Sequence, residues 1–151
     1  SMQRKLRTAS QSLVRDLRTH GLRLVLAESC TGGLLAALLT EVPGVSAFFC
    51  GSQVVYREDT KRRWAGVRGT TLAKRTAVSA EVADELVRGV LRKTPEATLA
   101  ASVTGYLGPT GEKVGRVYVA TIRRGETKAQ VHELDLRLRG RGGRTDEANR
   151  R

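Results

Sequence analysis

Three side chains in the first half of the chain have the chemistry to attack an amide. They are the hydroxyl of Ser46, the phenol of Tyr56 and the amine of Lys61, with nine and four residues between them. A serine is a weak nucleophile until a base removes its proton, and a lysine whose pKa is lowered by burial or nearby positive charge can act as that base. Tyr56 would relay a proton or donate to an oxyanion. The residue types alone favour a structural alternative, in which Ser46 caps a helix, Tyr56 packs in a strand and Lys61 is solvated.

Two polar segments that contain glycine, 28–33 and 102–105, each end an apolar run typical of a buried strand. If the two strands are neighbours, both segments face one crevice at the carboxyl ends of the strands. The first segment also precedes a helix, where free backbone N–H groups and the helix dipole favour an anion. The expected ligand contacts are Ser29, Cys30, Thr31, Gly32, Gly33, Ser102, Thr104 and Gly105.

Two residues of the first segment have more than one interpretation. Cys30 would be a thiol nucleophile with a lowered pKa at a helix N-terminus, or an inert buried residue, and we prefer the second. Glu28 would bind a ribose or place a favourable charge at the start of a helix.

Hydrophobic periodicity predicts the elements that must position these side chains. Helices are expected over 3–20, 33–41, 58–64, 71–75 and 79–93, and strands over 22–27, 97–103, 116–123 and 128–136. Within the mixed segment 46–56, the residues at 54–56 favour a strand, and the polar tail from Gly140 hints at a helix that begins near Thr145. This alternation predicts an α/β layered domain with a mixed sheet.

The bulk composition narrows the class of protein. A chain of 151 residues with 40% hydrophobic and 28% charged residues predicts one globular domain, with neither a membrane span nor a signal peptide, and hence a cytoplasmic location. Two cysteines and two histidines without ligand-like spacing argue against a metal site. The net charge of +12 makes a nucleic-acid partner an option, but aromatic residues form only 4% of the chain, so a solvated basic surface is favoured.

Read together, the motifs resemble one known family. The matching segments are Ala27–Gly33 (AESCTGG), Pro43–Ser46 (PGVS), Val55–Lys61 (VYREDTK), Ala77–Ser79 (AVS), Ser102–Gly105 (SVTG) and Val114–Val117 (VGRV), which cover about residues 5 to 135 in order. They are similar to the CinA C-terminal domain family, the nicotinamide-nucleotide amidohydrolases associated with competence/damage-inducible proteins and pyridine nucleotide salvage. The resemblance implies a three-layer α/β/α sandwich.

The same resemblance implies hydrolysis of nicotinamide mononucleotide to nicotinic acid mononucleotide and ammonia, without metal or cofactor. By position, Ser46 matches the nucleophile, Lys61 the base and Tyr56 the assisting phenol, while the AESCTGG and SVTG segments match the ligand-contacting loops. The small-molecule nucleotide is the expected partner, and the chain is expected to form a homo-oligomer.

This sequence departs from the family pattern in three places. The usual residues between the tyrosine and the lysine, Ser-Asn-Glu-Ala, are replaced by Arg57-Glu58-Asp59-Thr60, and the loop 106–113 is short. The C-terminal helix that closes the family's domain is expected to be truncated in the single domain 1–151. Two alternatives therefore accompany the hydrolase: an inactive CinA-like module that binds nucleotide, and a basic protein associated with nucleic acid.

Overall fold

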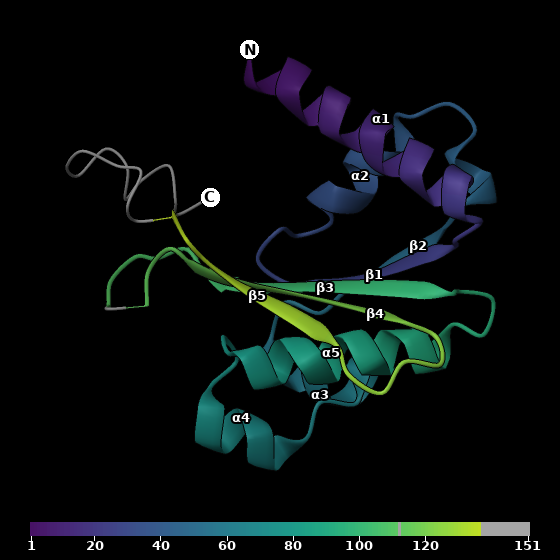
Figure 1. Cartoon of the computed structure of the whole chain (residues 1–151). Helices are drawn as coiled ribbons and strands as arrows, with labels where there is room; N and C mark the ends of the chain where they lie inside the picture. Colours follow the sequence, from purple (N-terminus) through teal and green to yellow (C-terminus); the bar gives the residue numbers. More distant parts are fainter. Residues whose placement is uncertain (112, 137–151) are drawn as a thin grey trace.

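A five-stranded mixed sheet forms the centre of the computed structural model, which describes residues 1–111 and 113–136 (Figure 1). The strands are β1 (Leu24–Glu28), β2 (Phe49–Val54), β3 (Leu99–Tyr106), β4 (Arg116–Arg123) and β5 (Gln130–Asp135). Their order is β2-β1-β3-β4-β5, with β2, β1 and β3 parallel and β4 and β5 antiparallel to their neighbours. The α/β class with a mixed sheet is confirmed.

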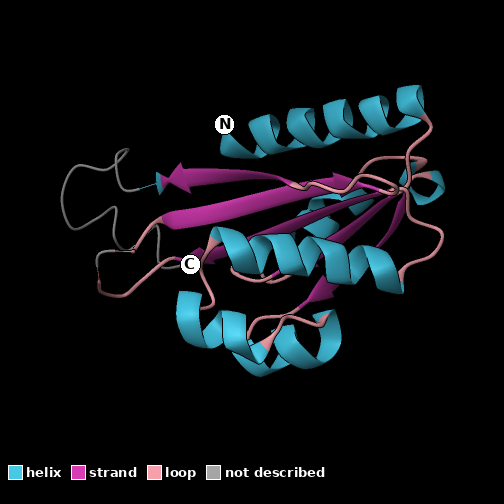
Figure 2. Ribbon diagram, turned by 60° about the horizontal axis from the view of Figure 1, so that its bottom comes forward, coloured by secondary structure: helices cyan, strands magenta, loops and turns pink. Residues whose placement is uncertain are grey.

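Helices cover both faces of the sheet, which gives the three layers that the resemblance implied (Figures 1 and 2). One face carries α1 (Met2–His20) and α2 (Leu34–Thr40), and the other carries α3 (Glu58–Ala65), α4 (Gly69–Arg75) and α5 (Ala80–Lys93). A 3₁₀ turn, η1 (Val45–Ala47), precedes β2. Two helix boundaries follow local signals: Gly21 ends α1 in the left-handed conformation, and the Ser79 hydroxyl accepts a hydrogen bond from the Val82 N–H at the start of α5.

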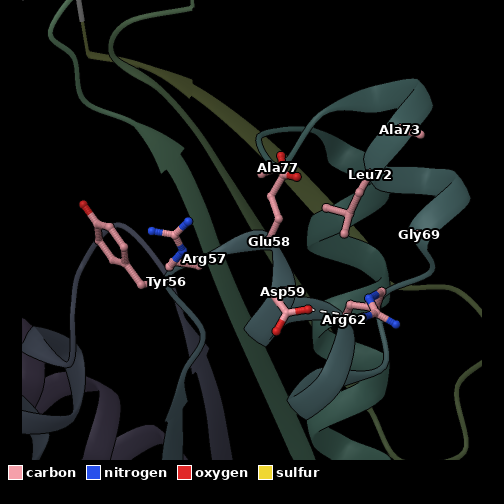
Figure 3. Close-up of a pocket in the computed structure, with 9 residues that line it drawn as sticks. All are labelled: Tyr56, Arg57, Glu58, Asp59, Arg62, Gly69, Leu72, Ala73 and Ala77. Carbon is pink, nitrogen blue, oxygen red and sulfur yellow. Dashed lines mark hydrogen bonds and ion pairs between the residues drawn. The ribbon is translucent and has the colours of Figure 1, made fainter.

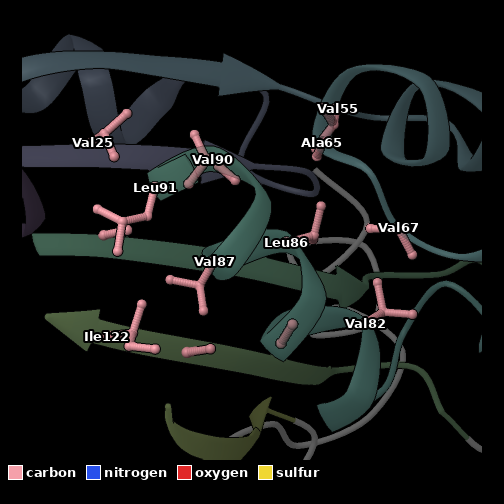
Figure 4. Close-up of a cluster of buried hydrophobic side chains, with 14 of the residues drawn as sticks. Val25, Val55, Ala65, Val67, Val82, Leu86, Val87, Val90, Leu91 and Ile122 are labelled. Carbon is pink, nitrogen blue, oxygen red and sulfur yellow. The ribbon is translucent and has the colours of Figure 1, made fainter. Parts of the chain in front are cut away.

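The two faces of the sheet have separate cores because side chains alternate along a strand. On β1, Leu24 and Leu26 face α1 and α2, whereas Val25 and Ala27 face α5. The larger cluster packs α5 onto the sheet (Figure 4). Its members from α5 are Val82, Ala83, Leu86, Val87, Val90 and Leu91. This packing sets the position of α5 relative to the carboxyl ends of the parallel strands. It also positions α3, which contacts α5.

One predicted turn is wrong. The segment 102–105 does not leave the sheet but lies within β3, where Ser102 pairs with Ala120 and Gly105 with Val117 of β4. Polar residues can continue a buried strand when each hydroxyl finds a partner, and here carbonyl oxygens next to the sheet supply those partners.

Two further observations concern the whole chain. Within the described residues, no helix is long and apolar enough to cross a membrane. The predicted polar tail from Gly140 and the helix expected near Thr145 lie outside the described residues.

Candidate functional site

The carboxyl ends of β1, β2 and β3 surround a cavity of about 330 Å³. It is lined by Ser29, Cys30, Tyr56, Lys61, Ala77, Val78, Thr104, Gly105, Tyr106, Leu107 and Gly108. Residues that directly follow three parallel strands meet here because those strands end at one edge of the sheet. We call this space the inner cavity.

Lys61 is the most unusual residue of the inner cavity. Its side chain is only 2% exposed, although α3 begins with two acidic residues at the surface. The ammonium group donates a hydrogen bond of 2.8 Å to the Tyr56 carbonyl oxygen, and within the described part of the chain no carboxylate lies close enough to form an ion pair with it. Burial lowers the pKa of Lys61, and the negative charge of Glu58 opposes that shift. A lysine with a lowered pKa is suited to accept a proton.

Ser29 and Cys30 bring a hydroxyl and a thiol to the same cavity. The Ser29 N–H donates to the Val103 carbonyl oxygen, and the Gly32 N–H closes a turn onto the Ser29 carbonyl. The backbone of Ser29 is therefore fixed between β1 and β3. Burial raises the pKa of the Cys30 thiol above its usual value, although the charge of Lys61 acts in the opposite direction. The thiol thus remains protonated at neutral pH, which fits the preferred interpretation of Cys30 as an unreactive residue.

The start of α2 does not offer a free anion site. The carboxylate of Glu28, which is 0% exposed, accepts hydrogen bonds from the Leu35 and Ala36 N–H groups and from the Thr31 and Ser52 hydroxyls. Burial alone would raise the pKa of Glu28, but these four hydrogen bonds bring it below the ordinary value. Glu28 is thus the internal charge at the start of the helix, and the prediction of a bound anion at this position is wrong.

The glycines and the hydroxyl beside Glu28 are consequently structural. The Thr31 side chain is committed to Glu28, and neither Gly32 nor Gly33 is among the residues that line the inner cavity. Gly32 and Gly33 have φ angles of 59° and 100°, which other residues rarely adopt, so they allow the turn between β1 and α2.

The structure separates Ser46 from Lys61. Ser46 is exposed in η1, before β2, where the neighbouring Phe48 carbonyl accepts a hydrogen bond from Leu24 at the start of β1. Lys61 lies beyond the other end of β2. The six residues of β2 between them correspond to roughly 20 Å. The predicted proton transfer from Ser46 to Lys61 within one chain is therefore wrong, because the two residues flank a strand instead of a turn.

The residues predicted in the second segment separate according to their position along β3: Thr104 and Gly105, near its carboxyl end, line the cavity, and Ser102 does not. The Ser102 hydroxyl is buried and donates to the Ala83 carbonyl of α5, so it is not a ligand contact. The Thr104 hydroxyl donates to the Ala77 carbonyl and thus holds the segment before α5 against the cavity. Gly105 lines the cavity, and a Cβ there would approach the Cys30 sulfur to 2.9 Å, so a larger residue would displace the thiol.

A wider, more open cavity of about 720 Å³ adjoins the inner one and shares Tyr56 and Ala77 with it (Figure 3). We call it the outer cavity. Its other lining residues are Arg57, Glu58, Asp59, Arg62, Gly69, Leu72 and Ala73. The side chain of Tyr56 is 67% exposed at the boundary, so it does not pack in a strand. Asp59 forms ion pairs with Arg62 and Arg63.

Several of these residues were not predicted from the sequence. Ala77 and Val78 belong to one of the motifs that carried the resemblance, which was the available signal for them. Tyr106 to Gly108 and Arg57 became candidates only through the fold. Across residues 1–111 and 113–136, no group of three or more histidine, cysteine or acidic residues is arranged to hold a metal ion.

Known proteins are similar to this chain in both sequence and fold. The family model of the CinA C-terminal domain matches residues 6–141. A CinA-like protein from Myxococcus xanthus is 48% identical over 72% of this chain, and one from Geobacter metallireducens is 45% identical over 75%. The matched regions are 26% and 28% of those relatives, so the chain corresponds to about a quarter of their length.

Solved structures match over more of their length. The competence/damage inducible protein CihA from Agrobacterium tumefaciens has a TM-score of 0.82 and 35% identity, over 96% of this chain and 89% of that one. A CinA superfamily protein from Escherichia coli has a TM-score of 0.81 and 29% identity, over 87% and 77%. This chain belongs to the CinA C-terminal domain family.

Proposed function

We propose that this chain is an amidohydrolase that converts nicotinamide mononucleotide to nicotinic acid mononucleotide and ammonia. The observation that carries the proposal is the buried amine of Lys61, whose pKa is lowered by burial and which shares a cavity with the hydroxyl of Ser29. Structural lysines are normally exposed or paired with an acid. A buried lysine without such a pair beside a hydroxyl is an arrangement suited to activating that hydroxyl.

The fold supports Ser29 as the nucleophile. We assign the role that the resemblance gave to Ser46 to Ser29, because Ser29 lines the cavity of Lys61 and Ser46 lies beyond the other end of β2. The neutral amine of Lys61 would accept the Ser29 proton as the serine oxygen forms a bond to the amide carbon. The C–N bond would then break, and the proton on Lys61 would leave with the amine as ammonia.

Water would complete the reaction in the same cavity. Lys61 would take a proton from water, whose oxygen attacks the serine ester, and would return that proton to Ser29 as the acid leaves. The Tyr56 phenol lies at the boundary of the two cavities, where it would donate to the oxygen that becomes negative. The neutral form of Lys61 is required at the first step, so the rate should rise with pH through its lowered pKa.

Ammonia release from nicotinamide mononucleotide by the purified full chain tests this proposal. We expect Ser29→Ala and Lys61→Met to lower kcat by at least about a thousandfold, since each removes a partner in the covalent step. Ser46→Ala is the matched control, a serine that lies outside the cavity, and should retain activity. Cys30→Ala should also retain most of the activity. Loss of ammonia release in Cys30→Ala alone would instead identify the thiol as the nucleophile.

Two results would favour the alternatives. Saturable binding of the nucleotide without any product would identify the chain as a CinA-like binding module. Affinity for DNA that falls steeply as salt increases, without binding of the mononucleotide, would favour the basic protein associated with nucleic acid.

A further inference from the structure

Arg57 stands out among the cationic residues of the two adjoining cavities. These residues are Arg57, Lys61 and Arg62. Lys61 is buried and bonded to the Tyr56 carbonyl, and Arg62 pairs with Asp59 at 3.2 Å. Within the described residues, no carboxylate lies within 4 Å of the Arg57 side chain, and none of its hydrogen bonds involves the guanidinium. Among the described residues that line these cavities, Arg57 is thus the cation whose charged group has neither a carboxylate partner nor a hydrogen bond.

The backbone of Arg57 is rigidly connected to the catalytic lysine. Its carbonyl accepts hydrogen bonds from the Lys61 N–H, at 3.0 Å, and from the Thr60 hydroxyl, at 2.8 Å. Arg57 precedes α3 in an extended conformation, with φ −91° and ψ 158°, so it occupies the corner between β2 and the helix. In Figure 3 the guanidinium is seen between the side chains of Tyr56 and Glu58. Tyr56 lines both cavities.

A mononucleotide bound with its amide near Lys61 must place its phosphate elsewhere. The start of α2 is already filled by the carboxylate of Glu28. In the outer cavity, Glu58 would repel a phosphate on its own side, while the guanidinium of Arg57 would attract it. A planar guanidinium also matches phosphate oxygens with two parallel hydrogen bonds.

We propose that Arg57 binds the phosphate of the substrate, so that the two cavities form one bipartite site, with the amide in the inner cavity and the phosphate at the corner of the outer one. The inference rests on the proposed function and specifies how that site selects a phosphorylated substrate. It assigns a specificity role to Arg57, for which the sequence resemblance implied none.

Kinetics and calorimetric binding with nicotinamide mononucleotide and with nicotinamide riboside, which lacks the phosphate, test the inference. Arg57→Ser should raise KM and Kd for the mononucleotide by about tenfold to a hundredfold, with kcat within about twofold, because a charge-assisted contact to a remote group is lost. Values for the riboside should hardly change. Glu58→Gln should lower Kd for the mononucleotide by removing a like charge.

Arg63→Ser is the matched control, because Arg63 lies on α3, the helix that Arg57 precedes, and lines neither cavity. Its effect on mononucleotide affinity should be small. Three outcomes would each overturn the inference. Arg57→Ser could lose as much affinity for the riboside as for the mononucleotide, or its Kd for the mononucleotide could stay unchanged. The third outcome is an unmodified chain that does not bind the mononucleotide. Affinity that depends on Arg57 without ammonia release would support it and refute the hydrolase, so the two proposals fail separately.

Discussion

At the scale of single residues, the burial of Lys61 opposes the stability of the folded chain. A buried amine without an acidic partner favours its neutral form, so folding must either remove a proton or bury a charge. The single bond to the Tyr56 carbonyl offsets only part of that cost. Such a residue is useful to the protein only if the neutral amine does something that a methionine could not.

This cost predicts that Lys61→Met is at least as stable as the unmodified chain while lacking activity. Because the pKa of Lys61 is lower in the folded state, the unfolded chain binds more protons between that pKa and 10.5, and the contribution of Lys61 to stability improves as pH rises through this window. We expect a gain of about 1 kcal/mol near pH 7, or roughly 2–4 °C in Tm, that shrinks as pH rises toward 10.5 and changes little above it. Thermal unfolding at several pH values checks it, and a variant that melts several degrees lower near pH 7 would show that burial of the amine carries no such cost.

At the scale of elements, the position of Lys61 depends on how closely α3 packs against α5. Gly89 of α5 lies directly under the carbonyl of Ala65, the last residue of α3, and a Cβ at this position would overlap that carbonyl oxygen. Glycine is therefore required here for a close approach of two helices, although it is a poor residue inside a helix.

Gly89→Ala should destabilise the fold despite the better helix propensity of alanine. The substitution gains about 1 kcal/mol of propensity, but the overlap forces α3 away from α5, and we expect a net loss of about 2 kcal/mol. Activity should fall as well, because α3 carries Lys61. In Gly69→Ala the new Cβ would lie 3.8 Å from Arg62 Cδ, an ordinary contact, so this control should unfold like the parent. Denaturant unfolding measures the stability of both variants. Equal unfolding midpoints for Gly89→Ala and Gly69→Ala would show that the close approach of α3 and α5 does not require glycine.

At the scale of the whole molecule, an apolar groove of about 380 Å³ lies between α1, α2 and the sheet. Leu6, Leu13, Leu35 and Leu38 contribute to its walls. The sequence of residues 137–151 has only Leu138 and Ala148 as apolar side chains, so its composition does not match this surface. A second copy of the chain is the occupant that fits the expected homo-oligomer.

We therefore expect the purified chain to form an oligomer, whose molecular mass is at least twice the 16.4 kDa of one chain. Leu13, which is 39% exposed in the groove, should be part of the contact, and Leu13→Glu should shift the protein toward the monomer. Leu134→Glu is the control, because Leu134 is 47% exposed on β5 and does not line the groove. Light scattering coupled to gel filtration measures the mass, and a monomeric parent chain would refute the expectation.

The local elements were predictable because their signals lie within a few residues of each other. The alternation over 116–123 matches β4, and the stop at Gly21 and the cap at Ser79 match α1 and α5. Propensity, capping and the period of the apolar residues act along the chain, so the α/β class follows from the sequence alone. The residue types of the site could be named for the same reason.

Only the tertiary structure decided which of these residues meet. Ser46 and Lys61 are closer in sequence than Ser29 and Lys61, yet β2 separates the first pair, and the parallel pairing of β1 with β2 brings the second pair to one cavity. The roles of Glu28 and Ser102 likewise depended on donors and acceptors that lie far away in the chain, such as Ser52 and Ala83. Strand register and the order of strands in a sheet are properties of the whole packed core, so no local pattern carries them.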